Sequence, residues 1–482
     1  MDGHRVIVRN YLYNVAYQVL VLMAPLVTAP YLARVLGAEC LGIYGYIASV
    51  SSVMQTVMML GLYTYGNRQI AYCRDDSKTV NRTFWILMAL RCGCGLIGLA
   101  AYLVFALVSK YRLYAFAYLP WLVANILDIS WLFVGYEDMK PTVMKNAGIK
   151  LASIVGILLF IKRQEDLWLY FMLISVGTLL GNLSIYPHAK KYVSSPELDT
   201  AGITKHLWGS IALFLPEAAA SLVLQVNRVL LGSMLPDVKQ TGYYDQSDKI
   251  VNIPMTFVTV FSTVMMPRIA HEISVGNDSS AGHYVVAAGK LALMIAIPLS
   301  LGIAGAAANL VPWFLGPGFE PAIPVIQILS PMVVANCLMG MTGSQYLTAR
   351  NETRYLSYVN AVGLVIVLAL DLLVIRRYGA IGAAASIVAS RFVVSLMQLA
   401  KVRKHLPLGE LARPCLHYIV AATIMFITIE VDSMFVQQGA ILTAVQFATG
   451  VFVYFIILRL LKDESFAMLI EMIVYRKLQV DR

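Results

Sequence analysis

Four polar residues occur at helical spacing inside an otherwise apolar stretch of the chain. They follow one another at i, i+4, i+8 and i+11: Glu217, Ser221, Gln225 and Arg228. In a helix this spacing places all four on one face. Together they can exchange hydrogen bonds with ligand hydroxyls, and the guanidinium can bind an anion through two parallel bonds. We therefore predict that this face lines a binding cavity, with Glu217 and Arg228 as its main charged groups.

Three further apolar stretches carry polar residues at similar spacing. These residues are Asn14 and Gln18 near the N-terminus, Gln55 in the second stretch, and Asn252 and Thr256 in the eighth. A polar side chain inside a bilayer is costly unless it meets a partner or water, so these residues are candidates for the same cavity. Hydrogen bonding between neighbouring helices is the alternative role for small polar residues.

Three more charged residues fall well inside apolar stretches, namely Arg91, Asp128 and Arg391. Arg91 and Asp128 lie at similar depth in consecutive stretches, roughly 12–14 Å from the same end at 1.5 Å per helical residue. We predict that they form an ion pair, and we keep all three as cavity candidates. Asp371 is the possible partner of Arg391.

The composition identifies the class of protein that must position these residues. The chain has 482 residues, of which 59% are hydrophobic and 13% charged. Soluble domains contain about 25% charged residues, and a soluble chain of this length could not cover its surface with so few. The sequence therefore indicates a multi-pass membrane protein. The net charge of +10 is assigned to membrane topology rather than to nucleic-acid binding, because no soluble basic domain is visible.

A helix that crosses a bilayer needs about 20 apolar residues. We count fourteen such stretches: 9–34, 40–66, 83–108, 113–136, 147–161, 167–187, 206–235, 249–270, 284–308, 322–347, 355–375, 380–400, 414–431 and 439–461. The predicted fold is an all-α membrane protein. Lys and Arg are concentrated in the connections that lie on the same side as both termini, which predicts cytoplasmic N- and C-termini.

The connections exclude several functions. The longest, 67–82 and 188–205, are too short for an extramembrane catalytic domain, which needs about 50 residues or more. The six cysteines are scattered without metal-ligand spacing, and no nucleotide-binding G-x-x-x-x-G-K-[ST] loop occurs. We expect no catalytic residues, no metal and no cofactor.

An internal repeat relates the two halves of the chain. Gly42, Tyr44 and Arg68 recur at an offset of 200 as Gly242, Tyr244 and Arg268. Six predicted spans separate the copies, so both copies have the same orientation. This predicts two six-helix lobes related by an axis along the membrane normal, a design that transporters use to alternate access to a site between the lobes. The expected divisions are lobes at 1–200 and 201–405, followed by two extra helices and a tail at 406–482.

Three segments of the chain resemble a known family. They are Asn14-Val15-Ala16-Tyr17-Gln18 through Ala29-Pro30-Tyr31 to Gly42-Ile43-Tyr44; Asp128-Ile129-Ser130-Trp131 with Gly135-Tyr136-Glu137-Asp138; and Leu215-Pro216-Glu217 through Arg228 to Pro267-Arg268. They are similar to bacterial polysaccharide flippases of the multidrug/oligosaccharidyl-lipid/polysaccharide exporter superfamily.

The resemblance implies a function and partners. The substrate would be an undecaprenyl-pyrophosphate-linked oligosaccharide, flipped across the bacterial cytoplasmic membrane for capsule, exopolysaccharide or O-antigen synthesis. Membrane lipid, a polysaccharide polymerase and a chain-length regulator would be the other partners, and nucleic acid would not. The alternatives are an ion-coupled multidrug exporter or a peptidoglycan-precursor flippase of the same fold. A membrane-embedded polysaccharide polymerase is the alternative of another class.

Overall fold

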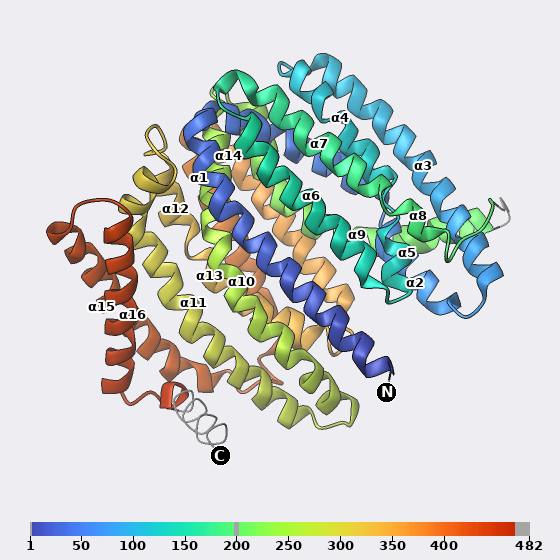
Figure 1. The fold of residues 1–482 in the computed structure, drawn as a ribbon. Coiled ribbons are helices and arrows are strands. Elements are labelled where there is room, and N and C mark those ends of the chain that lie inside the picture. The colour runs from blue at the N-terminus through green and yellow to red at the C-terminus, as the bar shows by residue number, and fades with distance from the viewer. Residues whose placement is uncertain (1, 197–201, 468–482) are drawn as a thin grey trace. The chain divides into compact units, whose positions relative to one another are not determined.

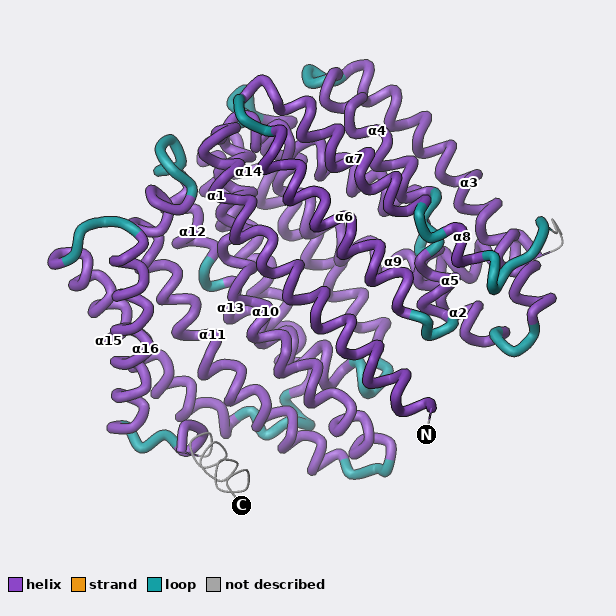
Figure 2. Tube along the Cα trace, in the orientation of Figure 1, coloured by secondary structure: helices purple, strands orange, loops and turns teal. Residues whose placement is uncertain are grey.

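The computed structural model describes the backbone of residues 2–196 and 202–467, together with their side chains outside 2–16, 215–217 and 257–264. Every regular element in this part of the chain is a helix (Figure 2). The chain forms two compact units, Met1–Gly242 and Tyr243–Arg482.

The helices α1 to α9 form the described part of the first unit (Figure 1). They are α1 (Asp2–Met59), α2 (Leu62–Cys73), α3 (Ser77–Val108), α4 (Arg112–Ile126), α5 (Ser130–Gly135), α6 (Met139–Phe160), α7 (Leu167–Leu183), α8 (Tyr186–Ala189) and α9 (Ile203–Met234), with the short 3-10 helix η1 (Gln164–Asp166) before α7. The next helix, α10 (Lys239–Ser274), begins in this unit and continues into the second.

The second unit contains the remaining helices. They are α11 (Asp278–Phe314), α12 (Ala322–Leu329), α13 (Met332–Met339), the π-helix η3 (Gly340–Leu347), α14 (Thr353–Val402), α15 (Gly409–Phe435) and α16 (Ala440–Leu460).

Ten helical segments among the described residues are long and apolar enough to cross a membrane, and an eleventh is added if the bent halves of α9 count as one span. One of these segments is α14, whose 50 residues would extend about 75 Å as one straight helix, against a hydrocarbon core of about 30 Å. It is broken at Gly379, which has a φ of 56°. The parts of α14 before and after Gly379 lie against each other. Tyr355 donates to the carbonyl of Met397, and Ser390 donates to that of Gly363.

Some stretches predicted as continuous spans are interrupted, and two of these breaks adjoin the site described below. The stretch 40–66 breaks at Leu60 and Gly61, whose φ angles are 44° and 71°. A Cβ on Gly61 would lie 3.0 Å from the carbonyl oxygen of Ser210, so the break allows α9 to approach the backbone closely. The stretch 113–136 breaks between α4 and α5. Hydropathy does not detect either break, because the residues on both sides are apolar.

The repeated glycines Gly42 and Gly242 meet in the first unit. A Cβ on Gly42 would lie 2.1 Å from the carbonyl oxygen of Val238, and one on Gly242 would lie 2.2 Å from that of Ala38. Real Cβ atoms do not approach a backbone oxygen so closely. The two positions therefore need glycine because each backbone packs directly against the other.

Candidate functional site

The interruption between α4 and α5 leaves backbone carbonyl groups of α4 without hydrogen-bond partners in the helix. Residues 127–129 are not helical, so the last carbonyl groups of α4 lack their usual partners four residues ahead. Inside a membrane, water cannot supply the missing donors, and irregular backbone persists only where the protein or a cavity satisfies it. Side chains from three other helical segments must therefore reach this break.

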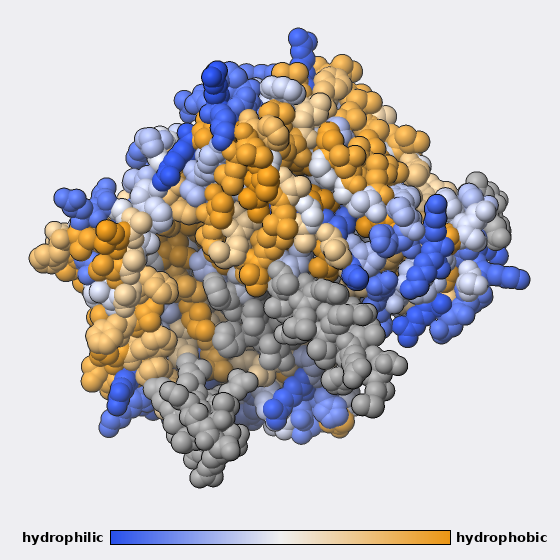
Figure 3. All heavy atoms as spheres, in the orientation of Figure 1, coloured by the Kyte–Doolittle hydropathy of each residue, from blue (hydrophilic) through white to orange (hydrophobic). Residues whose placement is uncertain are grey.

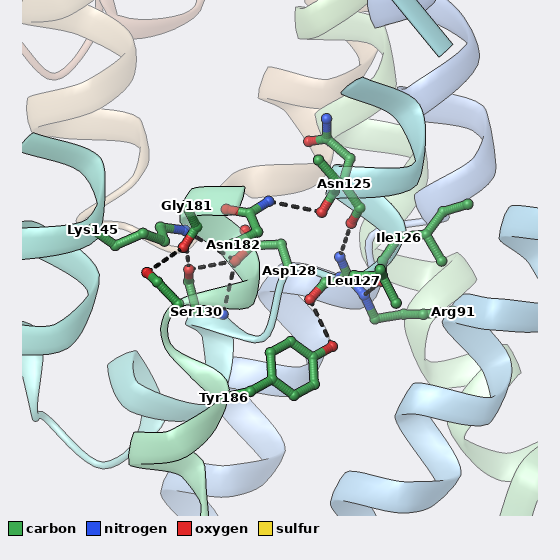
Figure 4. A network of polar contacts seen from close by, with 12 residues as sticks. Arg91, Asn125, Ile126, Leu127, Asp128, Ser130, Lys145, Gly181, Asn182 and Tyr186 are labelled. Atoms are coloured by element: carbon green, nitrogen blue, oxygen red, sulfur yellow. Dashed lines mark hydrogen bonds and ion pairs between the residues drawn. The ribbon is translucent and has the colours of Figure 1, made fainter. Parts of the chain in front are cut away.

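Four consecutive carbonyls at the break each receive a side-chain donor (Figure 4). Asn182 Nδ2 donates to the carbonyl of Ala124 at 2.7 Å. Arg91 bridges the next two, with Nη2 2.6 Å from the Asn125 oxygen and Nε 3.3 Å from the Ile126 oxygen, and Tyr186 OH donates to Leu127 at 2.9 Å. The unwound segment is thus held by α3, by α7 and by Tyr186 at the start of α8.

Asp128 stands in the break itself and pairs with a lysine of α6. Its Oδ1 accepts from Lys145 Nζ at 3.1 Å and from the backbone N–H of Ser130 at 3.0 Å. Lys145 Nζ also donates to Ser130 Oγ at 2.7 Å. The lysine side chain is 4% exposed and the aspartate side chain 21% exposed. The pair therefore joins the start of α5 to α6, with the carboxylate as its more accessible member.

The prediction that Arg91 and Asp128 form an ion pair is wrong. Lys145 takes the carboxylate, and Arg91 is committed to the carbonyls of the α4 terminus. The predicted span at 147–161 leaves Lys145 in the connection before it, but α6 begins at Met139 and carries this lysine into its buried part. The helix starts earlier than hydropathy suggests, because the polar residues of its first turns depress the local average.

A cavity of about 200 Å³ adjoins the break within the first unit. It brings together four of the predicted cavity residues, which are Gln55, Arg91, Asp128 and Ser221. Its other lining residues are Thr56, Met59, Gly61, Tyr63, Asn125, Phe214 and Ala218. The part of α1 that follows its break at Gly37, the α4–α5 break, α3 and α9 all contribute to this lining.

The chemistry of this cavity is that of a polar binding site. Arg91 is 2% exposed, and its Nη1 has no hydrogen-bond partner among the described residues. Asp128 supplies an acceptor close by, while Gln55 and Ser221 can donate and accept. Because its other two nitrogens are held by backbone, the guanidinium is oriented before any ligand arrives. The arrangement can bind a hydroxylated or anionic group.

The other predicted residues of the first unit are not part of this lining. Arg228 donates from Nη1 to the carbonyl of Leu224 one turn earlier at 2.8 Å, Gln225 is half-buried and Gln18 is exposed. The side chains of Asn14 and Glu217 lie outside the described residues. Their assignment to a cavity stays a prediction.

The second unit holds the remaining three predicted residues. Asn252 donates to the carbonyl of Asp248, and Thr256 donates to that of Ile253, so both make bonds within their own helix. Arg391 lies in α14, and its Nε has no hydrogen-bond partner in the part of the chain that the structure describes. The suggested pairing with Asp371 is not formed, since both carboxylate oxygens of this fully buried residue lack a hydrogen-bond partner among the described residues.

Four residues of the site were not predicted from the sequence, namely Asn125, Lys145, Asn182 and Tyr186. Their roles depend on the break after Ile126, and no proline or glycine at that position indicates the break. The available signal was the spacing of Asp128 and Ser130, since an Asp or Ser that bonds the backbone N–H two residues on favours a turn. Among the described residues, no group of three or more His, Cys, Asp or Glu side chains could hold a metal ion.

Comparison with known proteins identifies the fold. The chain is similar over 98% of its length to a structure of the lipid II flippase MurJ in an inward closed conformation, with a TM-score of 0.72, 15% sequence identity and 99% of that chain covered. It is also similar over 82% of its length to an inward-facing multidrug resistance MATE family transporter of the MOP superfamily, with a TM-score of 0.63, 14% identity and 94% of that chain covered.

Two curated sequences that are similar to the chain are named as transporters. A protein of Escherichia coli (strain K12) named "Putative O-antigen transporter" is 24% identical over 409 residues, which covers 82% of this chain and 97% of the relative. A protein of the same name from Shigella dysenteriae is 22% identical over 392 residues, with 79% and 96% covered. These relatives and structural neighbours are transporters or flippases, which agrees with the prediction of a transport protein rather than an enzyme.

The profile of a family described as "Polysaccharide biosynthesis protein" matches residues 7–273, more than half of the chain. Together with the fold, this match confirms the resemblance inferred from the residues. The chain is a multi-pass membrane protein that belongs to the polysaccharide biosynthesis protein family.

Proposed function

We propose that the protein flips an undecaprenyl-pyrophosphate-linked oligosaccharide from the cytoplasmic to the outer leaflet of the cytoplasmic membrane by alternating access. Such a molecule has a tail that stays in lipid and a headgroup of sugar hydroxyls and pyrophosphate. Its headgroup needs a polar cavity with a cationic group, whereas its tail needs none. The expected pathways are capsule, exopolysaccharide or O-antigen synthesis, with a polymerase and a chain-length regulator acting downstream.

The observation that carries the proposal is the unpartnered Nη1 of Arg91 beside a polar cavity inside an apolar bundle. A cavity of about 200 Å³ holds about six or seven water molecules. This is room for one polar group rather than for an oligosaccharide. Alternating access requires the space to widen, and the breaks at Leu60–Gly61 and at 127–129 in its lining are positions where helices can change direction.

The proposal includes an architecture of fourteen spans. The two arms of α14 and the two arms of α1 on either side of Gly37 each count separately, and α9 and α10 add one span each. Two lobes at 1–200 and 201–405, an appendage at 406–482 and cytoplasmic termini complete it. The reciprocal packing of Gly42 and Gly242 supports the repeat on which the lobes rest.

Within this architecture the remaining candidates retain proposed roles. Asn14, Gln18, Gln225 and Glu217 would face the substrate path at other stages of the transport cycle, and Arg228 would contact the pyrophosphate. In the second lobe the corresponding residues are Asn252, Thr256 and Arg391. The chain has no Walker-type loop, so the free energy would come from an ion gradient, from the membrane potential or from removal of the flipped product.

The test is a flip assay in vesicles that contain the purified full chain. A fluorescent undecaprenyl-pyrophosphate oligosaccharide is placed in both leaflets, and the fraction accessible to an external quencher is followed. We expect wild-type protein to make nearly all of the label accessible and Arg91→Gln to slow this markedly. Arg74→Gln, which removes an exposed ion pair with Glu137, serves as the control with wild-type rate.

Each alternative function predicts a different outcome. Efflux of fluorescent cations without movement of the lipid would identify a multidrug exporter. Movement of a peptidoglycan precursor but not of the oligosaccharide lipid would identify a precursor flippase. Elongation of the glycan by the purified protein would identify a polymerase.

A further inference from the structure

A second cavity of the first unit lies away from the Arg91 site, between α6, α7 and α8. It has a volume of about 830 Å³, within the range of sites that bind small molecules. Helices α6 and α7 pack side by side along it, and α8 lies at the end of α7 (Figure 1). Lys145, on the wall of this groove, is the same residue whose ammonium group pairs with Asp128.

The upper part of the groove is apolar and shaped by glycine. Gly148 of α6 and Gly177 of α7 both line it, and a Cβ built on either would meet no atom within 4 Å. The side chains around them include Met144 and Leu180, which are 62% exposed. The two helices pack tightly further along the groove, where a Cβ on Gly181 would lie 2.2 Å from Ile149 Cγ1. Beside Gly148 and Gly177 they leave open space next to apolar side chains, which suits a hydrocarbon chain.

The lower end of the groove is basic. Lys140, His188 and Lys191 line it, and all three are exposed. Lys191 Nζ lies 4.9 Å from the ring centre of Tyr192, and Tyr192 in turn donates to Asp138 at 2.9 Å. Asp138 is the only acidic residue of the lining. An adjoining cleft of about 290 Å³ shares Lys191 and Tyr192 and adds Lys78 and Lys190.

The surface around the groove is also hydrophobic near the apolar part and hydrophilic near the basic end. Figure 3 shows mainly hydrophobic residues over α3 and α7, and hydrophilic residues where α2, α5 and α8 meet. Tyr192 stacks on Tyr136 with ring centres 4.2 Å apart, and tyrosines are typical of the level where a bilayer meets water. The basic end of the groove is therefore placed at headgroup level, with the apolar part extending toward the bilayer core.

We infer that this groove binds one anionic phospholipid, with its phosphate at Lys140 and Lys191 and an acyl chain along Gly148 and Gly177. Basic pockets between transmembrane helices recognise anionic headgroups in this way. A soluble anion would leave the apolar part empty, and a neutral lipid would not use the lysines. The inference does not depend on the flippase activity, since a phospholipid bound here acts as a structural or regulatory ligand.

The test measures lipid binding to the purified full chain by native mass spectrometry. The probes are phosphatidylglycerol, phosphatidylcholine with identical acyl chains, and glycerol 3-phosphate without chains. A basic residue near an anionic headgroup contributes roughly fivefold in affinity. We therefore expect phosphatidylglycerol to bind about 20-fold more tightly than phosphatidylcholine, and glycerol 3-phosphate to bind far more weakly.

Two sets of variants test the two ends of the groove. The double variant Lys140→Gln with Lys191→Gln should abolish the preference for phosphatidylglycerol and leave phosphatidylcholine binding unchanged. Its control is Lys110→Gln with Lys162→Gln, at positions in other connections of the same unit. Gly177→Leu should fill the apolar part and weaken both lipids at least tenfold. Gly93→Leu is the matched control, because a Cβ there also meets no atom within 4 Å.

Several outcomes would overturn the inference. Equal affinity for the two lipids would remove the headgroup site, and unchanged lipid binding in Gly177→Leu would remove the chain site. Glycerol 3-phosphate binding as tightly as phosphatidylglycerol would make this a soluble-anion site. Displacement of phosphatidylglycerol by undecaprenyl phosphate at equal concentration would assign the groove to the transported substrate. If Gly177→Leu does not fold, the lysine variants decide the question alone.

Discussion

Removing Asp128 should destabilise the protein more than removing its partner Lys145. Without the carboxylate, both Lys145 and Arg91 remain as buried cations with no anion beside them. Without the lysine, Asp128 still accepts from the Ser130 N–H and lines the same cavity as Arg91. Removing Asp128 should therefore cost more stability than removing Lys145, and the difference depends on the charge of Arg91.

The loss of unfolding free energy in each variant depends on how deeply the ion pair is buried. Breaking a fully buried pair costs about 3–5 kcal/mol, but Asp128 keeps 21% of its side-chain surface exposed. We therefore expect about 3 kcal/mol for Asp128→Asn and about 1–2 kcal/mol for Lys145→Met. The double variant should cost less than the sum of the single variants by at least about 1 kcal/mol, because neither charge is then left without the other.

The assay is reversible unfolding of the purified chain in detergent micelles, with the four proteins of the cycle measured in one detergent at one pH. Arg74→Gln and its exposed partner Glu137 provide a reference cycle, which should show a coupling near 0–1 kcal/mol. Equal costs for the two single variants would refute the role given to Arg91. Strict additivity would refute the pair itself.

Three other predictions follow from single positions. Gly42→Ala and Gly242→Ala should each prevent folding or lower the unfolding temperature strongly, since the new Cβ would overlap a backbone carbonyl oxygen; Gly93→Ala, in open space, should be neutral or stabilising by about 0.5–1 kcal/mol. Asp76 accepts from the first turn of α3, and these bonds hold the pKa of its carboxyl below the usual 3.8. Asp76→Ala should therefore lower the unfolding temperature at neutral pH, and the difference from wild type should vanish as the pH falls through the lowered pKa. Arg228→Ala should impair export at a normal protein level, as polymer output and immunoblotting would measure; normal output would remove Arg228 from the site.

The membrane class and most spans could be predicted from the sequence because hydropathy reports a property that each residue carries by itself. The same applies to Gln55, Arg91, Asp128 and Ser221, which were selected because polar groups in apolar stretches need a reason. Their partners could not be predicted in this way. Lys145 pairs with Asp128 only because α6 starts at Met139 and lies beside the break, and both facts come from tertiary packing.

The break after Ile126 also explains why the cavity contains an arginine rather than a lysine. The two carbonyls of Asn125 and Ile126 need donors at two separate points, and the fork of a guanidinium supplies both and leaves Nη1 without a partner among the described residues. An ammonium group in Arg91→Lys keeps the charge but cannot bridge the two carbonyls with the same geometry. The backbone thus fixes the orientation of the cation, and what remains for a ligand is one directed N–H group. A ligand bound there must place an acceptor at that position. Loss of transport in Arg91→Lys together with near-normal stability would therefore indicate that direction, and not charge alone, determines binding.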